Sequence, residues 1–185
     1  MLHEKTNLQV QKIRESILKH QASREDGQYT SFYDGNDLDG IKGIECADEI
    51  INAIVDYSNS YAQATIDQDN NRSPEFNRDH VQLWYNVYHE GIHHCWHDHG
   101  RSLLSGTIYI HTDSESSPFA IKSPVLPLIK SWCSDFKDRW TQEIKFLPEP
   151  GDILIWPGFL EHQVKEQKAC KEPRISISFN IFYKR

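Results

Sequence analysis

Histidine is concentrated in one short stretch of this 185-residue chain, and it is the residue type here best suited to chemistry. Seven of the ten histidines lie between His80 and His111. His97 and His99 stand two residues apart, so on an extended strand both imidazoles would leave from the same face. This spacing predicts two adjacent ligands of a metal ion, but imidazole suits several transition metals and the spacing does not choose among them. A histidine-rich surface loop would show the same spacing.

Two later residues could complete such a site. His162 follows the apolar run Ile153–Trp156 and the turn Pro157-Gly158, and is either a third ligand or an ordinary structural histidine. Arg174 begins an alternating segment, and an unpaired buried charge there would be costly. Its planar guanidinium can grip a carboxylate with two hydrogen bonds, and Ser176 would point the same way. The alternative is an arginine paired with an Asp or Glu of the protein.

Three segments with a period of two must position these residues, because alternation places successive side chains on opposite faces of a sheet. They are residues 81–88, 105–111 and 174–181. One face of each is mostly aliphatic and the other carries Trp, Tyr, Asn, Ser and one Arg, which suits the wall of a semi-polar cavity better than an exposed surface. Trp84 and Tyr88 would shape that pocket, although aromatic side chains on strands more often belong to a core.

The rest of the chain predicts two helices followed by more strands. Thr6–Gln9 resembles a capping box before a helix ending near Gln21, and a second helix fits residues 46–62. Further strands fit residues 143–147 and 152–156, with a short strand after His162. Residues 25–27 and 67–74 fit loops, and residues 125–140 fit a short helix or a lid. His93 and His94 fit an approach loop, and the sequence assigns them no role. We predict a single domain, 1–185, with helical support over 1–78 and a mainly β core over 79–185, either a barrel or a double-sheet jelly roll.

Composition limits the classes of function. The formal charge of −7 argues against a broad nucleic-acid surface, and no run of about 18 apolar residues could span a membrane. The N-terminus lacks the core of a signal peptide, and the four scattered cysteines indicate reduced thiols. We therefore expect a cytoplasmic protein or, for a phage-encoded chain, one acting in the host cytoplasm.

The motifs taken together resemble those of the Fe(II)/2-oxoglutarate oxygenases, in particular a small family found in phages and bacteria. The resemblance covers roughly residues 80–183. It is carried by Trp84-Tyr85-Asn86-Val87-Tyr88 with Gly91, His97-Asp98-His99, residues 105–109, Pro150-Gly151-Asp152 to Pro157, His162, and residues 174–180.

This resemblance implies a double-stranded β-helix (jelly-roll) barrel, with the N-terminal helices packed on one sheet. It implies Fe(II) held by His97, His99 and His162, with 2-oxoglutarate as a small-molecule cosubstrate and O2 as the oxidant. Arg174 and Ser176 would bind the far carboxylate of 2-oxoglutarate, Asn86 and Tyr109 would donate further hydrogen bonds, and no catalytic residue is expected beyond the metal site.

One position departs from the superfamily, in which an Asp or Glu stands two residues after the first histidine. Here His99 occupies that place, so the third ligand is either His99 or the neighbouring Asp98. The sequence does not identify the primary substrate, the kind of oxidation or the oligomeric state.

Two other functions fit the same residues. The first is a cupin-like metal dioxygenase that uses no 2-oxoglutarate, against which Arg174 and Ser176 argue. The second is a jelly-roll binding protein without catalytic activity.

Overall fold

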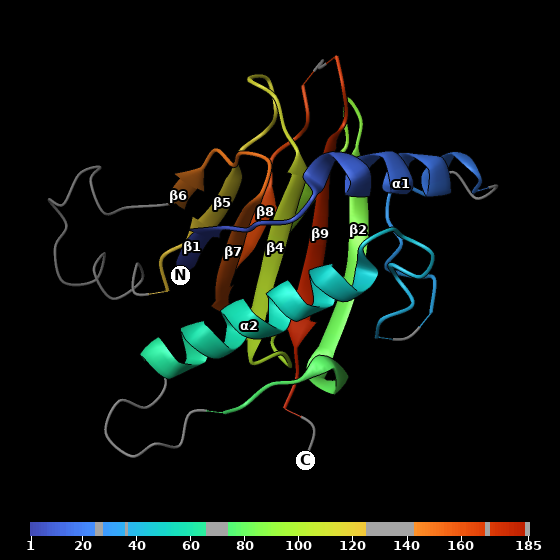
Figure 1. Ribbon diagram of the computed structural model, residues 1–185. Helices are drawn as coiled ribbons and strands as arrows, with labels where there is room; N and C mark the ends of the chain where they lie inside the picture. The colour runs from blue at the N-terminus through green and yellow to red at the C-terminus, as the bar shows by residue number, and fades with distance from the viewer. Residues whose placement is uncertain (25–27, 36, 66–73, 125–142, 169–170, 184–185) are drawn as a thin grey trace, which may run out of the picture.

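A computed structural model places two antiparallel β-sheets behind two α-helices (Figure 1). The structure describes residues 1–24, 28–35, 37–65, 74–124, 143–168 and 171–183. The larger sheet has the strand order β1-β7-β4-β9-β2 and the smaller one the order β3-β8-β5-β6. The predicted mainly β, jelly-roll architecture is confirmed. The lid predicted over residues 125–140 lies outside the described residues, as do the loop at 25–27 and most of that at 67–74.

The bounds of the elements follow the chain order. The helices are α1 (Val10–Ala22), α2 (Ala47–Thr65) and a short 3-10 helix η1 (Arg78–His80). The strands are β1 (Leu2–Lys5), β2 (Val81–Tyr88), β3 (His94–His97), β4 (Leu104–His111), β5 (Phe119–Lys122), β6 (Glu143–Phe146), β7 (Asp152–Pro157), β8 (His162–Val164) and β9 (Arg174–Ile181).

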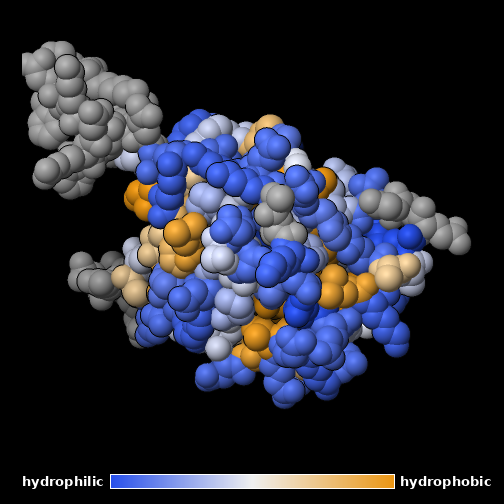
Figure 2. Space-filling view, turned by 90° about the horizontal axis from the view of Figure 1, so that it is seen from above, coloured by the Kyte–Doolittle hydropathy of each residue, from blue (hydrophilic) through white to orange (hydrophobic). Residues whose placement is uncertain are grey.

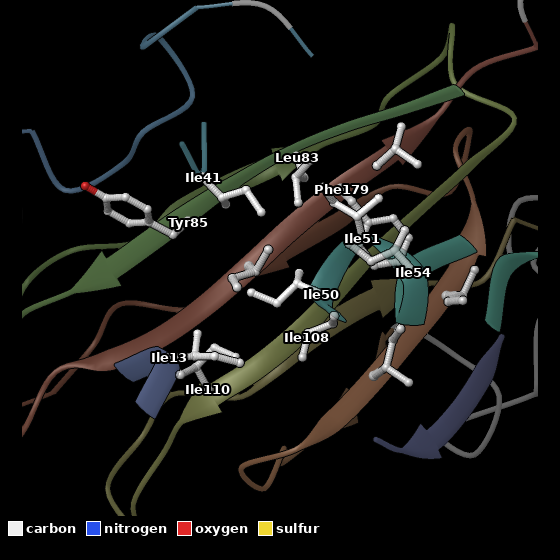
Figure 3. Packing of buried hydrophobic residues seen from close by; sticks show 14 of the residues in the cluster. Ile13, Ile41, Ile50, Ile51, Ile54, Leu83, Tyr85, Ile108, Ile110 and Phe179 are labelled. Carbon is white, nitrogen blue, oxygen red and sulfur yellow. The ribbon is translucent and has the colours of Figure 1, made fainter. Parts of the chain in front are cut away.

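The aliphatic face of the larger sheet packs against the two helices, as predicted. Ile13 and Ile17 of α1 and Ile50 and Ile54 of α2 are completely buried against β2, β4, β7 and β9. Figure 3 shows how side chains from the helices meet those of the strands, with Ile13 near Ile110. Since an α-helix buries one stripe and these strands bury one face, the helix spacing and the strand alternation fit together here.

The opposite face of the larger sheet turns toward the smaller sheet. A second buried cluster lies between them, formed by Tyr109 of β4, Leu154 and Trp156 of β7, and Phe119 and Ile121 of β5. The functional candidates lie on this inner side. The opposed sheets therefore separate a helix-covered aliphatic layer from an inner layer that also contains polar residues.

The N-terminal capping box was a wrong prediction. The hydroxyl of Thr6 donates to the carbonyl oxygen of Gly151 at 2.9 Å instead of capping a helix. The helix begins at Val10, after Gln9, whose side chain makes no capping hydrogen bond. Residues 2–5 form β1, which pairs with β7 and was not predicted. Tertiary pairing with β7 thus overrides the local sequence signal at this end of the chain.

The second helix begins one residue later than predicted and ends three residues later. Cys46 has a left-handed backbone with φ of 61° and lies outside α2. Cys46 and Cys95 are free thiols, which agrees with the predicted reduced state for these two. The other two cysteines are not among the described residues.

The outer surface matches the polar composition. The face seen in Figure 2 is mostly hydrophilic, with apolar side chains in separate groups. Among the described residues, no helix has both the length and the apolar character needed to cross a bilayer. The buried cluster on the helix side includes residues from both predicted parts of the chain, before and after position 79. That the chain is a single domain, and that it is cytoplasmic, are still predictions.

Candidate metal centre and anion pocket

The three predicted histidines come together in space. His97 ends β3, His162 begins β8, and the two are cross-strand partners. His99 follows in the turn after β3. One ring nitrogen from each of the three lies within 4.8 Å of the corresponding atoms of the other two. The rings are also close to one another. Their centroids lie 4.2 Å apart for His97 and His162 and 5.1 Å apart for His99 and His162. Such a cluster can hold a metal ion.

Backbone carbonyls fix the orientation of two of these rings. The Nδ1 of His97 lies 2.8 Å from the carbonyl oxygen of Cys95, and the Nδ1 of His162 lies 2.9 Å from that of Leu160. A carbonyl oxygen only accepts, so Nδ1 must carry the proton in each pair. The lone pair of a neutral imidazole then lies on Nε2, and this arrangement is the usual one for metal-ligating histidines.

The surroundings keep two of the imidazoles neutral. Burial lowers the pKa of His162 to about 3 and that of His99 to about 4, and neighbouring His97 contributes to both shifts. Burial disfavours the charged form because a cation loses water in the protein interior. Since a metal binds only the unprotonated nitrogen, these two rings are ready to ligate near neutral pH.

The expectation of an extended strand through His97 and His99 is only partly correct, because β3 ends at His97 and its pairing with β8 is irregular between His94 and His97. Asp98 is not a member of the histidine cluster. Its carboxylate accepts a hydrogen bond from the backbone N–H of Gly100 at 3.0 Å. A turn after the strand, rather than strand alternation, brings His99 to the other two rings.

Arg174 lies deep in the same region, with 1% of its surface exposed. Its guanidinium carbon lies 5.0 Å from the ring centre of Tyr88 and 5.1 Å from that of Tyr109. Within the described residues no carboxylate pairs with it, and its Nε and Nη1 have no hydrogen-bond partner. The alternative of a structural ion pair is therefore not found in this part of the chain. An unpaired buried cation with free donors is suited to binding an anion.

Two tyrosines and the arginine share one buried environment. Burial raises the pKa of Tyr88 to about 12 and raises that of Tyr109 further, although the Arg174 charge partly opposes both shifts. Both phenols therefore stay protonated near neutral pH. Among the described residues, the hydroxyl of Tyr109 has no hydrogen bond of good geometry, but it lies close enough to the Arg174 guanidinium to interact with it. A ligand oxygen could therefore contact both groups.

One pocket joins the histidine cluster to Arg174, and its wall includes every site residue predicted from the sequence. Asn86 donates to the hydroxyl of Ser178 at 3.1 Å, and Ser176 is the cross-strand partner of both Asn86 and Tyr109. The predicted residues in the wall are Trp84, Asn86, Tyr88, His97, His99, Tyr109, His162, Arg174 and Ser176. The polar faces of β2, β4 and β9 thus form a cavity wall, as their composition predicted.

Sequence reasoning placed one pocket residue wrongly. His94 was expected in an approach loop without a role, but it begins β3 and its ring stacks on that of His97 at 4.0 Å. Loss of water around the ring and the neighbouring His97 lower its pKa to about 4, although part of this side chain is open to solvent. Phe119 also lines the pocket, from strand β5, which was not predicted. The only sequence signal of β5 was a run of three apolar residues in a four-residue strand, which is too short to show a period.

Comparison with known proteins agrees with this geometry. A family model described as "Putative 2OG-Fe(II) oxygenase" matches residues 82–180, which is more than half of the chain. The chain belongs to this oxygenase family. The match begins in β2 and ends in β9, so it includes both parts of the pocket.

One solved structure supports the fold of this oxygenase family member, and a second shows a weaker similarity. A prolyl-4-hydroxylase from Pseudomonas putida superposes with a TM-score of 0.60 and 11% identity, covering 100% of this chain and 88% of that one. A 2OG-Fe(II) oxygenase family protein from Burkholderia pseudomallei has a TM-score of 0.41 and 13% identity over 54% of this chain and 43% of that one. No curated protein matches. At these identities the first similarity shows the jelly-roll fold and does not identify a substrate.

Proposed function

We propose that this chain is an Fe(II)- and 2-oxoglutarate-dependent dioxygenase that oxidises, most simply by hydroxylation, a C–H bond of its substrate. His97, His99 and His162 hold the iron, and Arg174 binds the far carboxylate of 2-oxoglutarate. The observation that carries the proposal is the buried guanidinium, which has no carboxylate partner among the described residues, in the same pocket as three converging imidazoles.

The residues fit the groups that the family requires. Imidazole nitrogens suit iron, and three ligands leave positions open for other groups. Asp98 is occupied with the N–H of Gly100, which supports His99 as the third ligand. When bound, the iron and 2-oxoglutarate together supply the oxidation of a substrate C–H bond by O2, with conversion of 2-oxoglutarate to succinate and CO2.

The protein contributes position, charge and exclusion of water. Arg174 orients an incoming dicarboxylate from the deep end of the pocket, and Ser176 and Tyr109 offer hydroxyl groups beside it. Trp84 and Tyr88 enclose the space. The cavity has a volume of about 40 Å³, close to the roughly 30 Å³ of one water molecule. Side chains along its wall must therefore move apart to admit the cosubstrate.

The test is anaerobic reconstitution with Fe(II) followed by addition of 2-oxoglutarate. We expect a visible charge-transfer absorption band and then succinate once air is admitted. An Arg174→Gln variant should retain iron but lose at least about 100-fold in 2-oxoglutarate affinity, because a buried charge-assisted pair is lost. Arg78→Gln is the matched control, since Arg78 pairs with Asp48 on the surface.

The results separate the alternatives that the sequence left open. Iron binding without affinity for 2-oxoglutarate would favour a metal dioxygenase of another kind. Binding of both without succinate formation would favour a binding protein. Unchanged 2-oxoglutarate affinity in Arg174→Gln would contradict the proposed role of this residue.

A further inference from the structure

A second cavity opens beside the histidine cluster, separate from the narrow space at Arg174. Its volume is about 190 Å³, equal to roughly six water molecules at about 30 Å³ each. It shares Trp84, Asn86, His94, His97 and His99 with the first pocket. A group seated in this second cavity would therefore lie directly beside the proposed metal ligands.

Its remaining wall comes from a segment that the family match does not include. Tyr29, Thr30, Phe32 and Tyr33 line the cavity, whereas the family model matches residues 82–180. This part of the wall therefore belongs to the N-terminal half of this chain. It is a place where the chain can define its own specificity.

The segment is held firmly against β2. The backbone N–H of Val87 donates to the carbonyl of Tyr29 at 2.8 Å, and that of Ser31 donates to the carbonyl of Tyr85 at 3.1 Å. Gly40 approaches the same strand so closely that a Cβ would lie 2.3 Å from the carbonyl oxygen of Leu83. The wall is thus built into the fold by backbone pairing on both sides of the aromatic residues.

Aromatic rings at the mouth remain open to solvent. Phe32 is 40% exposed and Tyr33 is 76% exposed. Phe32 contacts Trp84 and Tyr33 edge to face, with ring centres 4.9 Å and 5.2 Å away. Exposed aromatic rings beside a polar site commonly mark a binding surface. A ligand ring would add apolar contact here without displacing a structural partner.

Among the described residues, the wall of this cavity also has no fixed charge. None of the nine residues that line it is Lys, Arg, Asp or Glu. In the metal-free chain, an ionic group placed here would lose water and meet no opposite charge among these wall residues, which is costly. Hydroxyl groups of Tyr29, Thr30 and Tyr33 can serve an uncharged polar substituent.

We infer that this second cavity binds the primary substrate through an uncharged, hydrocarbon-rich group about the size of a single ring, packed on Phe32, Tyr33 and Trp84. This inference rests on the proposed function, since the metal site beside the cavity would act on the bound group. In the metal-free chain, a carboxylate, phosphate or ammonium group should bind in this cavity no more tightly than a neutral ring, because the described wall residues offer it no ionic partner.

The first experiment measures binding of indole, a neutral ring used as the probe, to the metal-free chain by NMR titration. Indole should bind, and Phe32→Ala and Tyr33→Ala should each weaken its affinity by up to about tenfold through lost ring contact. Tyr183→Ala is the matched control, because Tyr183 is similarly exposed at 64% but does not line the cavity. Absence of indole binding, or equal weakening by the control, would overturn the inference. Because the Tyr33 side chain is mostly exposed, Tyr33→Ala should fold normally. The test therefore remains valid even if Phe32→Ala does not fold.

The second experiment places the probe relative to the histidines. Paramagnetic Mn²⁺ bound at the cluster should broaden the indole signals, and His162→Ala should abolish the broadening while indole still binds, because His162 does not line the second cavity. Bound Mn²⁺ without broadening would overturn the inference and leave the metal site intact. Indole binding without any Mn²⁺ binding would instead count against the proposed function, while supporting the predicted ring preference.

The third experiment tests charge with the same ring. Indole-3-acetate and tryptamine should bind no more tightly than indole. The titration is repeated in Arg174→Gln, which removes the one buried guanidinium of the neighbouring pocket that could attract the added carboxylate. Affinity more than about tenfold higher for either charged ring in that variant would overturn the uncharged class, because about 1.4 kcal/mol of ionic stabilisation would then be present.

Discussion

The two faces of the five-stranded sheet are formed by the same strands but have different roles. In β9, Ile175, Ile177 and Ile181 face the helices, whereas Arg174 and Ser176 face the pocket. All five are buried. The helix side is packed mainly with apolar side chains, although the hydroxyl of Ser58 in α2 is also buried there without a partner among the described residues. The buried guanidinium nitrogens of Arg174 that likewise lack a partner lie on the pocket side.

This difference shows how a small domain can combine stability with a reactive interior. Apolar burial on one face stabilises the fold, while the other face keeps groups whose burial is unfavourable until a ligand satisfies them. Substitutions on the first face should therefore lower stability and spare binding. Substitutions on the second should change binding and affect stability less, or even raise it.

The largest effect is expected on the helix side. Ile177→Ala should lower the free energy of unfolding by about 3 kcal/mol, because it removes a completely buried side chain and leaves a cavity. Ser176→Ala, the adjacent residue facing the pocket, should cost less than about 1 kcal/mol. Urea denaturation of both variants measures the comparison. Equal losses would mean that the two faces do not differ as described.

The metal ligands provide the next largest effect. His99→Ala should weaken Fe(II) binding at least about 100-fold, or about 2.7 kcal/mol, through loss of a ligand. Asp98→Ala should change it by less than about threefold, because this carboxylate caps a turn at Gly100. Anaerobic titration with Fe(II) checks both variants. A larger loss in Asp98→Ala would make Asp98 the third ligand.

The sequence allowed the division between the two faces to be predicted, because a period of two is visible in eight-residue strands such as β2 and β9. The pocket side of these strands was therefore predicted correctly, down to Asn86 and Ser176. The four-residue strands β1 and β5 were not predicted, since their existence depends on pairing with β7, β6 and β8. Local pattern alone cannot show a partner distant in the chain.

The same limit explains the misplaced or missed site residues. His94 comes to the pocket because β3 pairs irregularly with β8, and no residue pattern indicates that irregularity. Tyr29 and Phe32 reach the cavity because their segment pairs with β2 across more than fifty residues of sequence. Backbone pairing is nearly independent of side-chain type. The aromatic residues of this segment therefore did not indicate that it pairs with β2 beside the cavity.

Acid should lower the free energy of unfolding of the metal-free chain, because His162 on the pocket side binds a proton more readily in the unfolded chain. Burial holds the pKa of His162 at about 3 in the folded state, whereas an unfolded histidine titrates near 6.5. Between these values the unfolded chain binds the proton first, so stability falls as the pH drops below about 6.5. We expect His162 to account for about 2 kcal/mol of loss between pH 7 and pH 4.5.

Chemical denaturation at several pH values, compared between the wild type and His162→Gln, isolates this contribution. The variant keeps a polar group at the position but cannot be protonated, so its stability should fall less steeply with acid. Parallel pH profiles for the two proteins would show that His162 is not held neutral by burial.

The smallest and most informative effect concerns Arg174. Arg174→Met should raise the free energy of unfolding of the ligand-free chain by about 1 kcal/mol, because an apolar side chain of similar length replaces a buried charge without a carboxylate partner. The stacking of the guanidinium on Tyr88 and Tyr109 offsets part of that gain. Adding 2-oxoglutarate should stabilise the wild type and leave the variant unchanged. The opposite result would be a variant that is several kcal/mol less stable than the wild type in the absence of ligand. Arg174 would then be a structural residue, and the pocket side would stabilise the fold as the helix side does.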